Sequence, residues 1–156
     1  MDDILYPLTT FKEQFSFVPE IKNKELLPHR KHIIVCGMGG SAISVSLIKL
    51  IFPSLSVTLH NDYGLPHMED PENTLLILNS YSGDTEEVLD TLTKALEAQM
   101  RVAILSKGGE LIRIAELFSI AHIVLPNTSL EPRFSIGFQI IGLLSLMSEQ
   151  QAVEIL

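Results

Sequence analysis

Short apolar runs and longer amphipathic stretches alternate along this chain. The apolar runs are typical of strands buried on both faces, because no polar residue interrupts most of their length. Five segments have this character: 33–36, 57–59, 75–78, 102–105 and 122–125. Runs of this kind favour a parallel sheet that helices cover on both sides.

Between these runs, apolar residues recur with helical spacing. The clearest case is 84–98, where one stripe of an amphipathic helix is formed by Val88, Leu89, Leu92, Ala95 and Leu96. Segments 41–52 and 110–118 are also predicted helices, and Pro53 ends the first of them. The alternation predicts an α/β fold, a three-layer α/β/α sandwich with a mostly parallel five-stranded sheet. Such sheets bind ligands at the carboxyl ends of their strands.

The length of 156 residues suits one domain, since single domains cluster near ~100–150 residues. We expect a single domain over 1–156, with a helical lead-in at 1–31 and an α/β core at 32–150. In the lead-in, Thr10 and Glu13 have the spacing of a capping box. One face of a short packing helix is predicted from Leu8, Phe11, Phe15 and Val18.

The predicted last helix, 133–150, has almost no polar face. Its apolar residues are Phe134, Ile136, Phe138, Ile140, Ile141, Leu143, Leu144, Leu146 and Met147. A helix on a protein surface needs a polar side. We therefore expect a partner to cover this helix, either a second copy in a homodimer or a second domain.

Composition narrows the classes of partner. With 46% hydrophobic and 19% charged residues the chain is expected to fold, and its net charge of −8 provides no basic surface for nucleic acid. The longest mostly apolar stretch, 134–147, contains polar residues and glycines and is shorter than the ~20 residues of a membrane span. We expect neither nucleic-acid nor membrane binding.

The single cysteine, Cys36, excludes an internal disulfide, and residues 1–3 lack the basic start of a secretory signal. Both observations predict a cytoplasmic protein. At the end of a buried strand, Cys36 is predicted to act as a small hydrophobic residue. We expect no metal and no cofactor, because the histidines have no metal-site spacing: His29, His32, His60, His67 and His122.

A glycine-rich loop at 37–42 follows the first predicted strand and opens a helix. Glycines there, Gly39 and Gly40 among them, allow backbone N–H groups to approach an anion beside Ser41. The loop also fits the dinucleotide fingerprint, with Asp62 about twenty residues onward as a ribose ligand. A phosphate site, a nicotinamide or flavin enzyme, and a simple packing turn all remain open from this loop alone.

A second loop, 79–85, favours the phosphate hypothesis. It follows another buried strand, opens another helix, and contains Ser80, Ser82, Gly83 and Thr85. Three hydroxyls and the free N–H groups of the helix's first turn can bind a phosphate without a lysine or arginine. We expect Asp84 to accept from backbone donors rather than to contact the ligand. A capped loop without any ligand is the alternative.

Four motifs occur in order: 37–43, 80–87, 106–109 and 132–133. Together they resemble the sugar isomerase (SIS) domain, most closely the N-terminal domain of bifunctional phosphoglucose/phosphomannose isomerases, over about 32–150. The resemblance implies that the two loops bind a sugar phosphate through Gly39, Gly40, Ser41, Ser80, Ser82, Gly83 and Thr85. It also implies that Arg133 lies in the active site and steadies an enediolate, as glucose 6-phosphate or mannose 6-phosphate is converted to fructose 6-phosphate.

The chain departs from the family in two respects. Glu131 stands where the family has glutamine, and Asp84 where it has asparagine. Full enzymes of the family have two SIS domains, and the second supplies the glutamate base and the ring-opening histidine. We therefore expect a fragment, a half enzyme or a one-domain relative that binds phosphosugar but isomerises it poorly.

Three alternatives stay open at this point. Glu131 can serve as a base, or it can merely pair with Arg133 at the surface. A non-catalytic phosphosugar-binding or regulatory module is a second alternative, and a dinucleotide-dependent oxidoreductase is a third.

Overall fold

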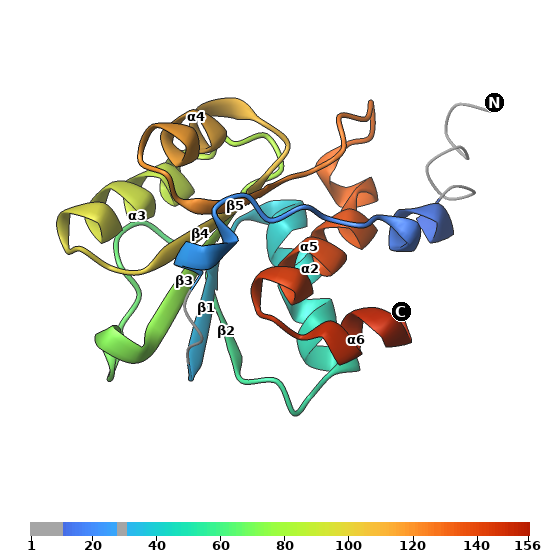
Figure 1. Ribbon diagram of the computed structural model, residues 1–156, viewed down its shortest axis with the longest axis horizontal. Coiled ribbons are helices and arrows are strands. Elements are labelled where there is room, and N and C mark those ends of the chain that lie inside the picture. Colours follow the sequence, from blue (N-terminus) through green and yellow to red (C-terminus); the bar gives the residue numbers. More distant parts are fainter. Residues whose placement is uncertain (1–10, 28–30) are drawn as a thin grey trace.

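A computed structural model describes residues 11–27 and 31–156 and contains a five-stranded sheet in the order β2-β1-β3-β4-β5 (Figure 1). All four neighbouring pairs are parallel. The strands are β1 (His32–Cys36), β2 (Val57–His60), β3 (Thr74–Asn79), β4 (Val102–Ser106) and β5 (Ala121–Val124). The expected α/β class and the five predicted strands are confirmed, with bounds that differ by one or two residues.

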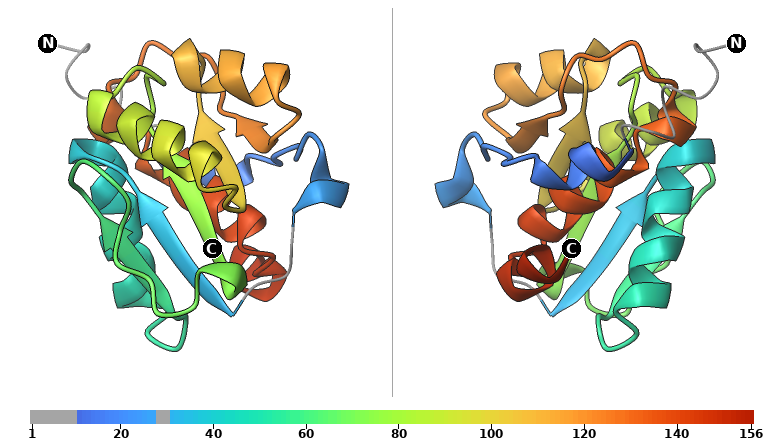
Figure 2. Two further views of the ribbon diagram at one scale, coloured as in Figure 1. Left: turned by 90° about the vertical axis from the view of Figure 1, so that its left-hand side faces the viewer. Right: turned by 90° about the vertical axis from the view of Figure 1, so that its right-hand side faces the viewer.

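Helices cover both faces of the sheet (Figure 2). On one face lie α2 (Gly39–Ile51) and α5 (Ile136–Leu146), and on the other lie α3 (Glu86–Glu97) and α4 (Gly109–Leu117). Alternate strand residues divide accordingly: Val35 and Ile77 pack toward α2 and α5, whereas Ile34 and Leu76 pack toward α3 and α4. Burial on both faces explains why the strands are apolar without interruption.

The register of the sheet brings four of its loops to one edge. Cys36 pairs with Leu78, Asn79 with Leu105, and Ser106 with Val124. The loops that follow β1, β3, β4 and β5 therefore leave the sheet side by side, because all these strands point the same way.

The prediction of one continuous helix over 133–150 is wrong. A 3₁₀ turn, η4 (Pro132–Phe134), precedes α5, and a separate short helix, α6 (Gln150–Ile155), follows it. Ser148 has a positive φ of 62°, a backbone conformation that a continuing α-helix cannot adopt.

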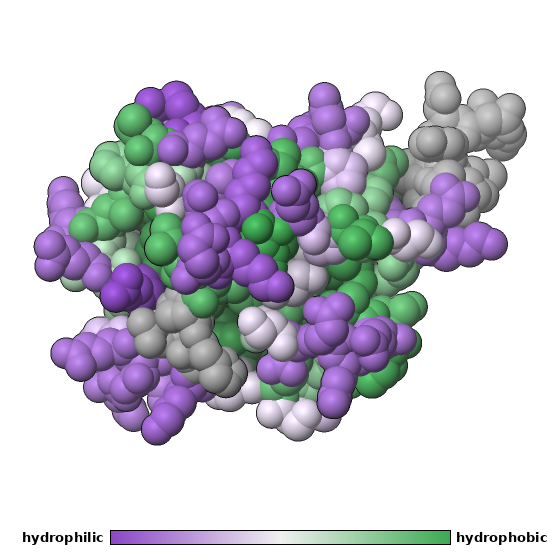
Figure 3. Space-filling model, viewed as in Figure 1, coloured by the Kyte–Doolittle hydropathy of each residue, from purple (hydrophilic) through white to green (hydrophobic). Residues whose placement is uncertain are grey.

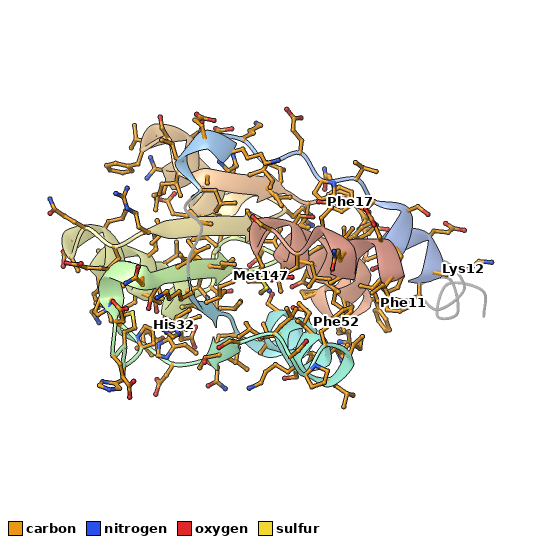
Figure 4. All side chains as sticks on the ribbon, turned by 60° about the horizontal axis from the view of Figure 1, so that its bottom comes forward. Phe11, Lys12, Phe17, His32, Phe52 and Met147 are labelled. Atoms are coloured by element: carbon orange, nitrogen blue, oxygen red, sulfur yellow. The ribbon has the colours of Figure 1, made fainter. Side chains whose placement is uncertain are left out.

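The apolar character of α5 has a cause within the chain. Nearly all of its residues are buried, and it packs against α2, β4, β5 and the 3₁₀ helix η1 (Phe11–Ser16). Phe17, labelled in Figure 4, meets Phe138 edge to face, with ring centroids 5.6 Å apart. The apolar pattern of this helix is therefore no evidence for a partner, because the sheet and the lead-in already cover it. Pairing with a second copy or a second domain stays a prediction.

The lead-in has a shape of its own. Its helix is 3₁₀ rather than α, the ring centroids of Phe11 and Phe15 are 5.4 Å apart, and the helix packs against α5 as expected. Val18, however, lies beyond this helix and is 88% exposed, so the predicted apolar face is wrong at that residue. Leu8 and Thr10 lie outside the described residues, so the predicted capping box is not part of this description. Further along are two more 3₁₀ turns, η2 (Lys24–Leu26) and η3 (Pro71–Asn73).

The outer surface mixes hydrophilic and hydrophobic residues on the face drawn in Figure 3. Over 11–27 and 31–156, no helix has the length and apolar character that crossing a membrane requires.

Candidate functional site

The loops after β1 and β3 touch at the carboxyl edge of the sheet. Gly37 approaches β3 so closely that a Cβ there would lie 2.9 Å from the carbonyl oxygen of Asn79. The amide of Asn79, fully buried, donates from Nδ2 to the carbonyl oxygen of Ser41 at 3.1 Å. A glycine is required at position 37 because any side chain would separate the two loops.

Ser41 joins the two loops from within. It is buried, and its Oγ accepts a hydrogen bond of 3.3 Å from the backbone N–H of Tyr81. The structure thus brings Ser41 beside the second hydroxyl loop, as the sequence predicted. Its hydroxyl, however, is already bonded to that loop in the described state.

Three hydroxyls converge after β3 in what we call the hydroxyl cluster: Ser80, Ser82 and Thr85. Ser80 Oγ lies 2.7 Å from Thr85 Oγ1 and 3.4 Å from Ser82 Oγ, and it accepts from the N–H of Gly83 at 3.1 Å. Ser80 is buried, Thr85 is half-buried and Ser82 is exposed. The cluster therefore has a fixed base and an open side, which suits capture of an anion from solvent.

Helix α3 begins directly after the cluster. Its N-cap residue, Thr85, makes no side-chain cap bond, so the hydroxyl is left to the cluster. The first-turn N–H groups of an α-helix have no partner within the helix, and the macrodipole places about half a positive charge there. The predicted combination of hydroxyls and a helix N-terminus is present at this position.

The loop after β4 holds the hydroxyl cluster from the other side. Gly83 has a positive φ of 87°, and a Cβ there would collide with the carbonyl oxygen of Gly108. Leu111 N donates to the carbonyl oxygen of Gly83 at 3.0 Å. A residue other than glycine at 83 would be strained and would also push the loops apart.

Asp84 accepts a hydrogen bond of 2.9 Å from the backbone N–H of Glu110, in the first turn of α4. The prediction that it satisfies a backbone donor is confirmed. The donor belongs to the next helix rather than to α3, which sequence spacing alone did not indicate.

Lys107 is a site residue that the sequence analysis did not assign. Its Nζ lies 4.9 Å from the ring centroid of Tyr81, the residue between Ser80 and Ser82, and its N–H donates to the carbonyl oxygen of Tyr81 at 3.1 Å. A cation within about 6 Å of an aromatic face is attracted to it. The sequence feature that could have indicated this residue is a lysine directly after a buried strand, in the motif at 106–109.

Glu131 and Arg133 lie on a turn against the start of α2. A Cβ at Gly40 would be 2.9 Å from the backbone nitrogen of Arg133, so this glycine permits the close approach. Arg133 Nε and Glu131 Oε2 are 3.2 Å apart, and the two side chains are 71% and 61% exposed. The structure places both predicted residues at the same edge as Gly40 and Ser41, as a surface ion pair.

Other candidate chemistry is absent from the described part of the chain. Burial raises the pKa of the Cys36 thiol to about 12, so it stays protonated and is a poor nucleophile at neutral pH. Over 11–27 and 31–156, no group of three or more His, Cys, Asp or Glu side chains is placed to hold a metal ion. A cavity of about 370 Å³ lies away from these loops, between 71–72 and 98–101.

Comparison with known proteins gives one consistent relationship. No family model matches the chain. A bifunctional phosphoglucose/phosphomannose isomerase of Caldicellulosiruptor bescii is 33% identical over 125 residues, 78% of this chain and 36% of that protein. A protein of the same name from Aquifex aeolicus is 30% identical over 151 residues, 94% of this chain and 46% of that protein. The chain thus spans less than half the length of these relatives.

Solved structures share the fold. A hypothetical protein of Thermus thermophilus matches with a TM-score of 0.58 and 23% identity, over 97% of this chain and 42% of that one. The sugar isomerase domain of an RpiR transcription factor from Sphaerobacter thermophilus matches with a TM-score of 0.56 and 16% identity, over 97% of this chain and 91% of that one. The Vibrio vulnificus NanR protein complexed with ManNAc-6P matches with a TM-score of 0.57 and 16% identity, over 96% of this chain and 65% of that one. The chain therefore belongs to the family of the bifunctional phosphoglucose/phosphomannose isomerases and corresponds to less than half of their length.

Proposed function

We propose that this chain is the phosphosugar-binding domain of an aldose–ketose isomerase of the phosphoglucose/phosphomannose type. The reaction would interconvert glucose 6-phosphate or mannose 6-phosphate with fructose 6-phosphate through an enediol. The observation that carries the proposal is the hydroxyl cluster, held within 3.4 Å at the N-terminus of α3 in a relative of such isomerases. An acidic protein needs a local site of this kind to hold a dianion.

The phosphate would be held by neutral donors. Ser82 and Thr85 would donate from the open side, Ser80 supports them, and the N–H groups of the first turn of α3 complete the shell. Gly83 keeps the loop close to the loop after β4. At the start of α2, Gly39 leaves open space for the ligand beside Ser41, and Gly40 lets the turn of Arg133 approach. Lys107 adds a positive charge at the rim of the site.

Arg133 would steady the enediolate oxygens. A guanidinium presents several donors in a fixed plane and suits a charged pair of oxygens, and its exposure leaves it free to exchange Glu131 for a ligand. Glu131 is the candidate base within the chain. Among the described residues, no histidine bonds to either of these two side chains, so a group that opens a sugar ring would have to come from elsewhere.

A second sugar isomerase domain or a second copy of this chain would supply the missing groups. Relatives more than twice as long support this arrangement. Since α5 is buried within the chain, the contact would form around the exposed side chains of Glu131 and Arg133 rather than through α5. We place the protein in the cytoplasm, where Cys36 would persist as the buried free thiol seen here.

A non-catalytic phosphosugar sensor is the second candidate. NanR, a structure with this fold, is complexed with a sugar phosphate. In the present chain the phosphate loops are well formed, whereas the candidate base is paired to an arginine at the surface. The two candidates share ligand binding and differ in turnover.

Thermal unfolding with fructose 6-phosphate and with NAD tests the ligand class. The proposal expects an increase in melting temperature with the sugar phosphate and none with NAD, and the increase should be lost in Ser82→Ala. Stabilisation by NAD alone would instead support the dinucleotide enzyme that the first loop left open.

A further inference from the structure

Gln14 is a buried polar residue that neither the proposed site nor simple packing explains. It comes from η1, is only 1% exposed, and lies among phenylalanines of the lead-in. Its Nε2 donates to the carbonyl oxygen of Phe134 at 2.6 Å. Its Oε1 accepts from the backbone N–H of Gly137 at 3.0 Å. One side-chain amide thus bonds both a carbonyl at the end of η4 and an N–H group at the beginning of α5.

The fit is close on the side of α5. A Cβ at Gly137 would lie 2.7 Å from the Cβ of Gln14, so this glycine lets the amide reach the helix terminus. Ser135, the N-cap residue of α5, makes no side-chain cap bond to the helix. The cap comes instead from a residue more than a hundred positions earlier in the sequence.

Two more buried side chains bind the same turn. Ser135 Oγ donates to the carbonyl oxygen of Glu131 at 3.1 Å, and Gln139 Nε2 donates to that of Pro132 at 3.2 Å. Both residues are fully buried. Carbonyls on both sides of Arg133 therefore receive side-chain donors, and we call Gln14, Ser135 and Gln139 the turn frame.

The frame fixes the backbone of a residue whose side chain is exposed. Arg133 has a side chain that is 71% exposed, yet its backbone nitrogen packs against Gly40 at the start of α2. A long side chain that starts from a fixed Cα reaches a bound ligand at a lower entropic cost than one on a mobile turn. Three buried side chains thus donate to one short turn whose own charged side chains, Glu131 and Arg133, are exposed.

We propose that Gln14 is a positioning residue for Arg133, so that the lead-in takes part in the active site. This rests on the proposed function, in which Arg133 binds the enediolate oxygens. The amide of Gln14 acts through the carbonyl of Phe134 and the N-terminus of α5 and does not touch the ligand.

The test separates the arginine's contribution from phosphate binding. Two ligands are compared by calorimetry: arabinonate 5-phosphate, whose carboxylate mimics an enediolate, and arabinitol 5-phosphate, which has an alcohol there. The ratio of their affinities measures how much Arg133 contributes to binding the carboxylate. The affinity for inorganic phosphate measures what the phosphate site contributes without the arginine. The variants are Gln14→Leu, Gln139→Met and Arg133→Ala, with the exposed neighbour Glu13→Gln as the matched control.

The parent and Glu13→Gln should prefer the carboxylate ligand by roughly tenfold or more, as one charge-assisted contact provides. Arg133→Ala should lose the preference, and Gln14→Leu should lose most of it, while both bind inorganic phosphate like the parent. If Gln14→Leu does not fold, Gln139→Met removes another donor from the same turn and should reduce the preference in the same way.

A Gln14→Leu or Gln139→Met chain that folds and keeps the full preference would overturn the inference and leave Gln14 as a structural cap. If Arg133→Ala keeps the preference for the carboxylate ligand, Arg133 does not bind the enediolate oxygens and Gln14 cannot position it for that role. Failure of the parent to bind any of the three ligands would instead reject the proposed function itself.

Discussion

The hydroxyl cluster and the Glu131–Arg133 turn lie at the same edge of the sheet, yet they are built in opposite ways. In the cluster the functional groups themselves are fixed, since the hydroxyls of Ser80 and Thr85 bond each other at 2.7 Å. At the turn only the backbone is fixed, and both functional side chains are more than half exposed. Capture of a phosphate needs donors arranged in advance. An arginine and a carboxylate that act on the reacting end of the sugar can be ordered later, when a ligand or a second domain binds.

The comparison predicts binding without efficient catalysis, which is the largest expected effect. The isolated chain should turn over fructose 6-phosphate about 10²–10⁴-fold more slowly than a complete relative, because a positioned general base is missing. A coupled assay for glucose 6-phosphate measures this. Rapid turnover that disappears in Glu131→Gln would establish Glu131 as the base and contradict the prediction.

Removing two hydroxyls of the cluster should nearly abolish phosphosugar binding. Ser82→Ala removes a hydrogen bond to a charged oxygen, with a loss of about 1.5–3 kcal/mol. Ser80→Ala removes the buried hydroxyl that holds Ser82 and Thr85 in place. Calorimetry with fructose 6-phosphate on the double variant measures the loss. Ser46→Ala, an exposed serine on α2, is the control. Unchanged affinity in the double variant would place the phosphate elsewhere.

Two glycines with positive φ should differ in their tolerance of a side chain. Gly83→Ala should reduce the free energy of unfolding by about 2–4 kcal/mol, because backbone strain adds to a collision with Gly108. Gly39→Ala has the strain, with φ 51°, but open space around it, so about 1–2 kcal/mol is expected. Urea unfolding of both variants measures the difference, and equal losses would show that the loop after β4 yields.

Cys36, buried at the end of β1, makes the stability of the fold depend on pH. Its pKa is raised by burial from 9.0 to about 12 in the folded state. Between these pH values the unfolded thiol loses its proton while the folded thiol keeps it, so the free energy of unfolding should fall as pH rises above about 9. Urea unfolding at pH 8 and pH 10, with Cys36→Ala as the control, measures a loss that the control lacks.

The exposed ion pair should contribute least. Arg133→Ala and Glu131→Gln should each change the free energy of unfolding by about 0–1 kcal/mol, because water screens a pair at the surface. Thermal unfolding without ligand checks this. A larger loss would mean that the turn is held by the Glu131–Arg133 ion pair rather than by the turn frame. The turn would then resemble the hydroxyl cluster, in which the functional side chains themselves are fixed.

The sequence by itself determined the layers of the fold and the positions of the glycine and hydroxyl loops between strands and helices. Strands buried on both faces must be apolar throughout, so segments such as 33–36 and 75–78 could be recognised without a structure. Hydroxyls between a buried strand and a helix are visible in the sequence, so the convergence of Ser80, Ser82 and Thr85 could be expected. These signals are local, because each depends on residues near one another in the chain.

Only the tertiary structure decided which segments meet. An apolar pattern shows that α5 is covered but not by what, and the cover proved to be the sheet, α2 and the chain's own lead-in. Asp84 caps α4, Lys107 lies over Tyr81, and Gln14 holds a turn more than a hundred residues away. Contacts between distant segments depend on how the whole chain packs, and no local spacing records them.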